Sequence, residues 1–170
     1  MIAVDTTFLI ALFEPEAFPH IDRCHDRVRC FIDALSKSHE QVLIPAPVLA
    51  ELAAGRLSRI EEILQDLKAQ RVFVIQQFDE VIAIETGGLI DKMKRAIPVA
   101  ERPQGFRTMM KYDAMIAAAA RVRGARALAT DNVRDFAPML AGWKIEIIAL
   151  VDLPLPPPEQ PGLFPKGSAE

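Results

Sequence analysis

Short apolar runs of four to six residues alternate with longer amphipathic stretches along most of the chain. The amphipathic stretches repeat apolar side chains every three or four residues, which is the spacing of a helix with one buried face. Short apolar runs between such helices are typical of the buried strands of a parallel sheet. We therefore predict an α/β fold with a mainly parallel five-stranded sheet, covered by helices on both faces. The expected strands are residues 2–5, 41–45, 71–75, 126–130 and 145–150.

Proline and glycine set the limits of the helices expected between these strands. Pro15 stops the first helix, Gly55 caps the third, and residues 97–108 form a loop. The chain becomes rich in proline after the last strand, so we predict one domain over residues 1–153 and an extended tail over 154–170. The expected helices are residues 6–13, 21–37, 47–55, 57–68, 79–96, 110–123 and 132–140.

The composition, 51% hydrophobic and 25% charged over 170 residues, fits one globular domain with a sizeable core. No apolar run approaches the roughly 20 residues of a membrane span, and the N-terminus lacks the pattern of a signal peptide. Cys24 and Cys30 fall on different faces of one expected helix, which favours reduced thiols over a disulfide. We therefore expect a cytoplasmic protein with no membrane contact.

The net charge of −3 does not by itself indicate a nucleic-acid binder, but the distribution of charge changes the picture. Between Lys92 and Arg126, nine basic residues are opposed only by Glu101 and Asp113. The acidic excess lies elsewhere in the chain. This basic segment is therefore a candidate surface for phosphate groups.

Four acidic residues from distant segments are predicted to meet at one edge of the sheet. Asp5 ends the first strand, and Asp131 directly follows the fourth. Glu51 lies one turn into the helix after the second strand, and Asp113 starts the helix that precedes the fourth strand. All four positions therefore lie at the carboxyl ends of the strands, where sheets of this kind bind ligands.

Each of these acids also has a purely structural explanation. Asp5, Asp113 and Asp131 could each cap a following helix, and Glu51 could be a solvated helix residue. Capping does not require every cap to fall at the same end of one sheet, however. It also does not explain an acid between two leucines at position 51.

Carboxylates gathered at one edge repel one another unless a cation lies among them. Oxygen ligands suit Mg²⁺ or Mn²⁺, and such an ion can activate a water molecule and neutralise charge on a phosphodiester. Thr7 and Thr130 could orient the carboxylates through hydrogen bonds, or could serve only in turns and caps.

Four stretches in this order resemble the PIN-domain nucleases, in particular the VapC-like toxins of bacterial type II toxin–antitoxin pairs. The stretches are "VDTTFLI", "IPAPVLAEL", "YDAMIAAAA" and "ALATDNVRDF", and the resemblance spans residues 1 to about 150. It implies a three-layer α/β/α sandwich and Mg²⁺-dependent endoribonuclease activity on RNA. It also implies homodimerisation and inhibition by a cognate antitoxin protein.

The resemblance assigns Asp5, Glu51 and Asp113 to the first three acidic positions of the family. The fourth is Asp131 or Asn132, because the family pattern has Thr, any residue, and then Asp or Asn. All five are candidate metal ligands, and the four acids are candidate catalytic residues.

Basic residues near Asp113 are candidates for holding the RNA. Arg102, Arg107 and Lys111 could bind phosphates or could belong to a solvated surface. Tyr112 could stack on a base or could be a partly buried core residue. A stripe of apolar residues on the 57–68 helix either packs in the core or receives an antitoxin helix. Its members are Leu57, Ile60, Leu64 and Leu67.

Several other functional classes are excluded because residues that they need are missing. Thr7 stands where an Asp-x-Asp phosphatase needs a second acid, and no glycine-rich turn for a dinucleotide follows the first strand. The third strand is not followed by the phosphoacceptor aspartate of a receiver domain. The cysteines and histidines of residues 20–30 do not have zinc-finger spacing. Two alternatives stay open: a non-catalytic PIN-fold module that binds RNA or protein, and a DNA nuclease.

Overall fold

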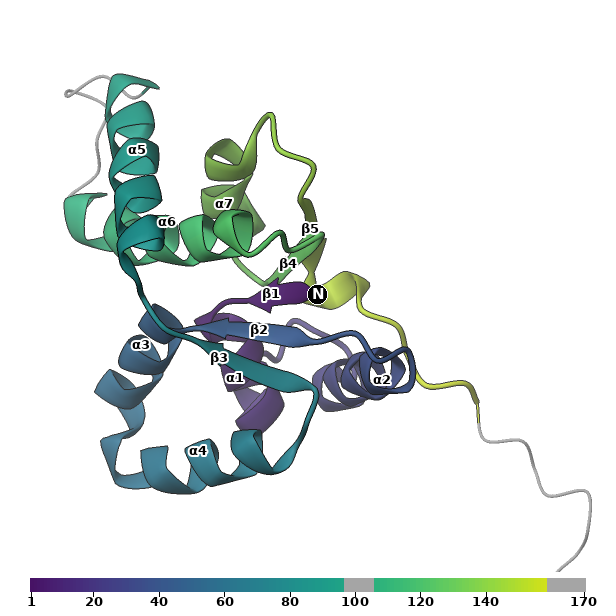
Figure 1. Ribbon diagram of the computed structural model, residues 1–170. Coiled ribbons are helices and arrows are strands. Elements are labelled where there is room, and N and C mark those ends of the chain that lie inside the picture. The colour runs from purple at the N-terminus through teal and green to yellow at the C-terminus, as the bar shows by residue number, and fades with distance from the viewer. Residues whose placement is uncertain (97–105, 159–170) are drawn as a thin grey trace, which may run out of the picture.

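Five strands form one sheet in the order β3-β2-β1-β4-β5 (Figure 1). They are β1 (Ile2–Val4), β2 (Val42–Pro45), β3 (Phe73–Gln76), β4 (Ala127–Thr130) and β5 (Glu146–Ala149). Every neighbouring pair is parallel, which confirms the expected α/β fold and its parallel sheet. This computed structural model describes residues 1–96 and 106–158, with only the backbone described at 106–109.

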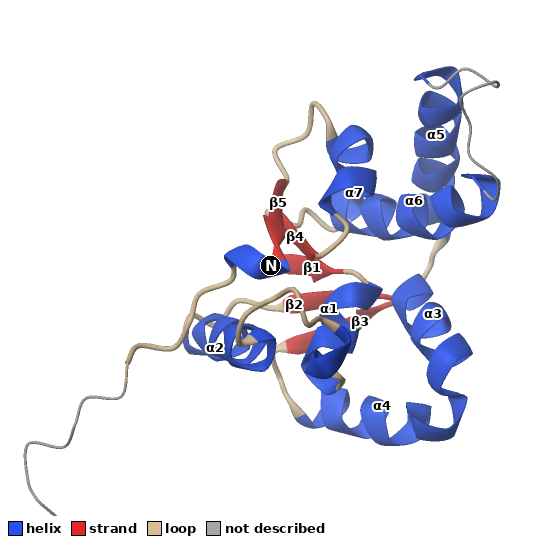
Figure 2. Cartoon of the chain, turned by 180° about the vertical axis from the view of Figure 1, so that it is seen from behind, coloured by secondary structure: helices blue, strands red, loops and turns tan. Residues whose placement is uncertain are grey.

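Helices cover both faces of the sheet, so the three-layer sandwich implied by the resemblance is present (Figures 1 and 2). One face carries α1 (Thr6–Phe13), α2 (Cys24–Lys37), α3 (Ala46–Arg56) and α4 (Ile60–Ala69). The other face carries α5 (Glu80–Ala96), α6 (Phe106–Val122) and α7 (Val133–Leu140). Short 3₁₀ turns lie at η1 (Pro15–Ala17), η2 (Leu57–Arg59) and η4 (Leu150–Asp152).

The strand order places a switch point between β1 and β4. From β1 the chain moves outward to β2 and then β3, whereas from β4 it moves the other way to β5. The connections therefore diverge at the carboxyl ends of β1 and β4, and open α/β sheets bind ligands in the crevice that this divergence leaves. Asp5 and Asp131 directly follow these two strands.

Several helix limits differ from the sequence prediction. The helix expected from residue 21 begins at Cys24, because the chain turns there and Arg23 adopts a left-handed conformation with φ of 51°. The third helix continues past Gly55, so the predicted glycine cap is wrong. The helix expected from residue 110 already begins at Phe106. The predicted loop therefore overlaps α6 at 106–108, and residues 97–105 lie outside the described residues.

The apolar stripe on the fourth helix divides between the core and the surface. Leu67 is fully buried, and Ile60 packs partly buried against the core. Leu64 is half-buried. Leu57, in contrast, lies in η2 before the helix and is 76% exposed. The core interpretation therefore holds for the helical part of the stripe and is wrong for Leu57.

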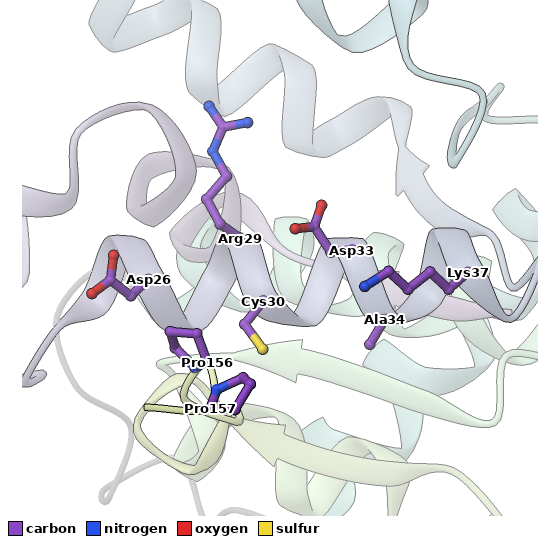
Figure 3. A pocket seen from close by; sticks show the side chains of 8 residues that line it. All are labelled: Asp26, Arg29, Cys30, Asp33, Ala34, Lys37, Pro156 and Pro157. Carbon is purple, nitrogen blue, oxygen red and sulfur yellow. The ribbon is translucent and has the colours of Figure 1, made fainter. Parts of the chain in front are cut away.

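The described start of the C-terminal tail packs against α2. The Arg27 guanidinium donates a hydrogen bond to the Leu153 carbonyl at 2.5 Å, and Leu153 is buried. A cavity of about 410 Å³ lies between α2 and Pro156 and Pro157 (Figure 3). Cys30 borders this cavity as a free thiol, and Cys24 is also free, as the sequence predicted. The predicted domain boundary at residue 153 stays a prediction, since the structure describes the tail only as far as residue 158.

None of the helices in the described part of the chain is both long enough and apolar enough to cross a bilayer.

Candidate functional site

Asp5 is the most enclosed acid of the predicted group. It follows β1 and caps α1, because its Oδ1 accepts a hydrogen bond from the Phe8 backbone N–H at 3.1 Å. The Thr7 hydroxyl donates to the same oxygen at 2.7 Å, and the Thr130 hydroxyl donates to Oδ2 at 2.6 Å. The side chain is therefore a helix cap and also a carboxylate with a fixed orientation at the carboxyl edge of β1 and β4.

Burial raises the pKa of Asp5 to about 6, because the charged form loses its hydration. The hydrogen bonds from Thr130, Thr7 and the Phe8 amide lower this pKa, whereas the negative charge of Glu51 raises it further. Capping α1 would not by itself require a raised pKa at Asp5. The shift therefore marks Asp5 as a functional-site candidate.

Asp113 lies inside α6 and not at its start, so the prediction that it begins the helix is wrong. The helix begins seven residues earlier, at Phe106, and the half-buried Asp113 lies near its middle. Burial raises the pKa of Asp113 to about 7, and the charges of Asp135, Glu51 and Asp5 raise it as well. The charges of three carboxylates from three other segments thus act on Asp113, as the proposed convergence requires.

Glu51 is held at the site by a short hydrogen bond from the Thr6 hydroxyl at the start of α1. Its side chain is half-buried in α3 and is not the solvated helix residue of the structural alternative. Its negative charge contributes to the raised pKa of both Asp5 and Asp113. α1 and α3 are therefore linked at the carboxyl edge by a side-chain contact that also places Glu51 beside the other acids.

The segment after β4 is fixed to Asp5 through the two threonines. The Asp131 N–H donates to the Thr7 hydroxyl at 2.9 Å, and the Asn132 N–H donates to the Thr130 hydroxyl at 2.8 Å. Each threonine thus accepts from this segment and donates to the Asp5 carboxylate. These backbone hydrogen bonds hold residues 131–132 at the site independently of the contacts that their side chains make.

The side chains of Asp131 and Asn132 engage different partners. The Asp131 carboxylate lies 3.1 and 3.3 Å from Nε2 of His20, an exposed residue of the loop before α2. Asn132 takes the N-cap position of α7, and its Nδ2 donates to Asp135 at 2.9 Å. Neither residue caps the helix through its side chain.

Asp135 is the site residue that the sequence reasoning left without a role. It lies in the first turn of α7. Of the three carboxylates whose charge raises the pKa of Asp113, Asp135 has the largest effect. Asp131 does not contribute to the pKa shift of either Asp5 or Asp113. The carboxylates that act on one another are therefore Asp5, Glu51, Asp113 and Asp135.

The four carboxylates do not form a closed cage. Within residues 1–96 and 106–158, no three acidic, histidine or cysteine side chains lie close enough together to hold one metal ion among them. Mg²⁺ takes only one or two carboxylates directly and keeps several waters, so a looser ring of acids suits it. Charge repulsion that raises pKa values is also the electrostatic condition that a divalent cation relieves.

Much of the basic segment is occupied by ion pairs away from the acids. Arg121, Arg123 and Arg126 pair with Glu85, Asp79 and Glu40 respectively. The Arg121 guanidinium also lies 3.1 Å from the centre of the Trp143 ring. The end of the segment after Asp113 is therefore largely structural.

The predicted RNA-binding residues fall at the start of α6 or before it. Arg102 lies outside the described residues, and of Arg107 only the backbone in α6 is described. Lys111 and Tyr112 are exposed immediately before Asp113, with Tyr112 at 37%. Tyr112 is therefore at the surface and not a core residue.

The fold and part of the sequence match known proteins. A family model described as PIN domain matches residues 2–137. No curated protein sequence matches the chain significantly. The solved structure of FitAB bound to an IR36 DNA fragment has a TM-score of 0.59 at 21% identity, covering 91% of this chain and 98% of that one.

Two further solved structures have the same fold. VapBC2 from Rickettsia felis, bound to a DNA fragment from its promoter, has a TM-score of 0.58 at 18% identity, covering 86% of this chain and 98% of that one. VapC20 from Mycobacterium tuberculosis, a toxin that cleaves the sarcin–ricin loop, has a TM-score of 0.54 at 18% identity, covering 84% and 96%. At these identities the likeness concerns the fold, whereas the family model matches sequence over most of the molecule. The chain belongs to the PIN domain family.

Proposed function

We propose that this protein is a metal-dependent endoribonuclease and the toxin of a toxin–antitoxin pair. The observation that carries the proposal is the group of four carboxylates, Asp5, Glu51, Asp113 and Asp135, at the carboxyl edge of β1 and β4. Two of them have pKa values raised to about 6 and about 7, partly by the charge of the others. A non-catalytic binding module has no need to hold four acids against their own repulsion.

Asp5 and Asp113 would hold Mg²⁺ or Mn²⁺ most directly, with Glu51 and Asp135 acting through water. When bound, the ion would supply a nucleophilic water at neutral pH and would neutralise charge on the phosphodiester. Thr7 and Thr130 fix both oxygens of Asp5 before any ion arrives. The amide of Asn132 orients Asp135 in the same way. We thus propose Asp135 as the fourth acid, in place of Asp131 or Asn132.

RNA is the proposed substrate, with Lys111, Arg107 and Arg102 holding phosphates beside Asp113. Support comes from the VapC20 toxin, which shares the fold and cleaves the sarcin–ricin loop. The similar VapBC2 and FitAB structures support a cognate antitoxin as partner. We further propose a cytoplasmic homodimer. Val81 and Ile84 of α5, which are 54% and 77% exposed, are its candidate contacts.

The test compares wild type with Asp5→Asn on matched single-stranded RNA and DNA, with Mg²⁺ and with a chelator. We expect Mg²⁺-dependent cleavage of RNA by wild type and a loss of at least about 1,000-fold in Asp5→Asn, because an amide cannot replace the metal-binding charge. Asp22→Asn, an exposed change in the loop before α2, is the matched control and should keep full activity.

Each other outcome selects a different function. Equal cleavage by wild type and Asp5→Asn would contradict the proposed site. Preferential cleavage of DNA would favour a DNA nuclease. RNA binding without cleavage, at any divalent ion, would favour the non-catalytic module.

A further inference from the structure

His20 is brought to the edge of the acidic site from a loop far away in the sequence. It lies between η1 and α2, 111 residues before Asp131, yet its Nε2 is 3.1 Å from the Asp131 carboxylate. Phe18 and Ile21 on either side are 8% and 4% exposed, so both ends of this short loop are anchored in the core. The His20 side chain between them remains 59% exposed.

The position of the imidazole is fixed relative to the catalytic acids by a chain of hydrogen bonds. His20 holds the Asp131 side chain, the Asp131 N–H donates to Thr7, and the Thr7 hydroxyl donates to Asp5. The ring also lies against Phe18, with centres 5.9 Å apart and planes tilted by 52°. A polar contact this exposed stabilises a protein little, so fold stability does not explain the arrangement.

The chemistry of the pair determines what the ring can offer to a ligand. A carboxylate only accepts hydrogen bonds, so Nε2 is the donor in the contact with Asp131. In neutral imidazole the other nitrogen, Nδ1, is then an acceptor. Among residues 1–96 and 106–158, no group donates a hydrogen bond to Nδ1. An acceptor at the rim of an RNA site cannot bind a phosphate oxygen, but it can bind a hydroxyl.

We propose that His20 binds the substrate by accepting a hydrogen bond from a ribose 2′-hydroxyl of the bound RNA at the edge of the acidic site. The inference rests on the proposed ribonuclease function and adds to it a source of preference for RNA over DNA, since the 2′-hydroxyl distinguishes the two. By binding the Asp131 carboxylate, His20 also keeps that negative charge from facing the RNA backbone unpaired. Asp131 thereby serves as the support of His20.

The experiment is a double-mutant cycle: substitution of His20 in the protein is combined with removal of single 2′-hydroxyl groups in the RNA. RNA binding is measured by fluorescence anisotropy in an Asp113→Asn background, which removes cleavage but keeps the Asp5–Thr7–Asp131 contacts. One 2′-deoxy nucleotide is placed at each position around the cut site mapped with wild type. His20→Phe keeps a ring beside Phe18 and removes both nitrogens. His39→Asn, at the opposite edge of the sheet where φ is 57°, is the matched histidine control.

With His20 present, we expect one 2′-deoxy position to weaken binding by about three- to tenfold, the loss of one hydrogen bond. His20→Phe should bind all-RNA more weakly by a similar factor and should lose nothing further at that position. His39→Asn should behave as the parent. An unchanged 2′-deoxy penalty in His20→Phe would overturn the proposal. Full affinity in His20→Phe with loss in His20→Ala would also overturn it, in favour of base stacking.

The proposed nuclease function can fail separately from this inference. The cycle measures binding alone, so RNA that binds with a His20-dependent 2′-hydroxyl contact but is never cut by wild type contradicts only the nuclease. Cleavage by wild type, together with no 2′-deoxy position whose effect on affinity depends on His20, contradicts only the role of His20. If no cleavage gives a cut site, the 2′-deoxy position is instead scanned along the whole oligonucleotide.

Discussion

At the amino end of the sheet Glu40 is surrounded by cations, whereas at the carboxyl end Asp5 and Asp113 face other carboxylates. The Arg126 guanidinium binds both oxygens of Glu40 at 2.7 and 2.9 Å, and the Met1 amino group lies 2.9 Å from one of them. The hydrogen bond from Arg126 is the main reason that the pKa of Glu40 is lowered to about 2. The pKa values of Asp5 and Asp113 are instead raised to about 6 and about 7.

The difference separates a structural carboxylate from a functional one. Ionisation of Glu40 stabilises the fold, because its charge is matched by neighbouring cations. Ionisation of Asp5 and Asp113 opposes folding, because burial and like charges disfavour it. A protein keeps such a cost where a ligand offsets it, and here that ligand is the proposed divalent cation.

After the loss expected in Asp5→Asn, the largest expected effect concerns the fourth acid. We expect Asp135→Asn to lower Mg²⁺-dependent RNA cleavage by about 10- to 100-fold, the usual range for a residue that supports a metal site. Asp131→Asn should lower kcat by less than about threefold, since the Asp131 side chain binds His20 and not the other acids. Single-turnover cleavage rates at saturating RNA measure both. A greater loss of kcat in Asp131→Asn than in Asp135→Asn would restore Asp131 as the fourth acid.

The second expected effect concerns the free energy of unfolding of the metal-free protein and its dependence on pH. Because folding raises the pKa of Asp5 and Asp113, the folded state binds protons more tightly than the unfolded state. These two groups therefore make the free energy of unfolding increase as the pH falls from about 8 towards 4. Asp113→Asn removes one of them and should stabilise the metal-free protein by about 1–2 kcal/mol at pH 8, discounted for its partial exposure.

Urea unfolding at pH 8 and pH 5, in a chelating buffer, measures this prediction. The gain from Asp113→Asn should shrink at pH 5, and added Mg²⁺ should stabilise wild type more than the variant. Asp66→Asn, an exposed acid on α4, is the control and should change neither quantity. If Asp113→Asn destabilises the metal-free protein at pH 8, the carboxylate is a structural group.

The strands were predictable because their signal is local. A buried strand of a parallel sheet is an apolar run. Four of the five expected runs contain the observed strand, and the run 71–75 covers all of β3 except Gln76. The start of α6 was not predictable in this way, because residues 106–109 follow a proline- and glycine-containing segment and carry no clear cap. Asp113 thus reaches the site from inside a helix, although the sequence placed it at the helix start.

The contacts of the site depended on information that no local pattern holds. Asp131 and Asn132 are adjacent, and only the backbone path after β4 decides that one side chain meets His20 and the other Asp135. The His20–Asp131 contact joins segments 111 residues apart. The spacing of Asn132 and Asp135, three residues apart at the start of a helix, was the one available signal for the fourth acid.

The smallest expected effect tests the other side of the comparison. Glu40→Gln removes the charge that binds Arg126 and should destabilise the protein by about 1 kcal/mol at pH 7, in the range of a partly exposed ion pair. Because the pKa of Glu40 is lower in the folded state, its contribution is complete above about pH 4.5 and disappears as the pH falls towards 2. Urea unfolding at pH 7 and pH 3 should thus show a smaller difference at the lower pH. RNA cleavage should be unchanged, since Glu40 lies at the end of the sheet away from the acids. A loss of cleavage in folded Glu40→Gln would show that the two ends of the sheet are coupled, contrary to their separation into a structural and a functional edge.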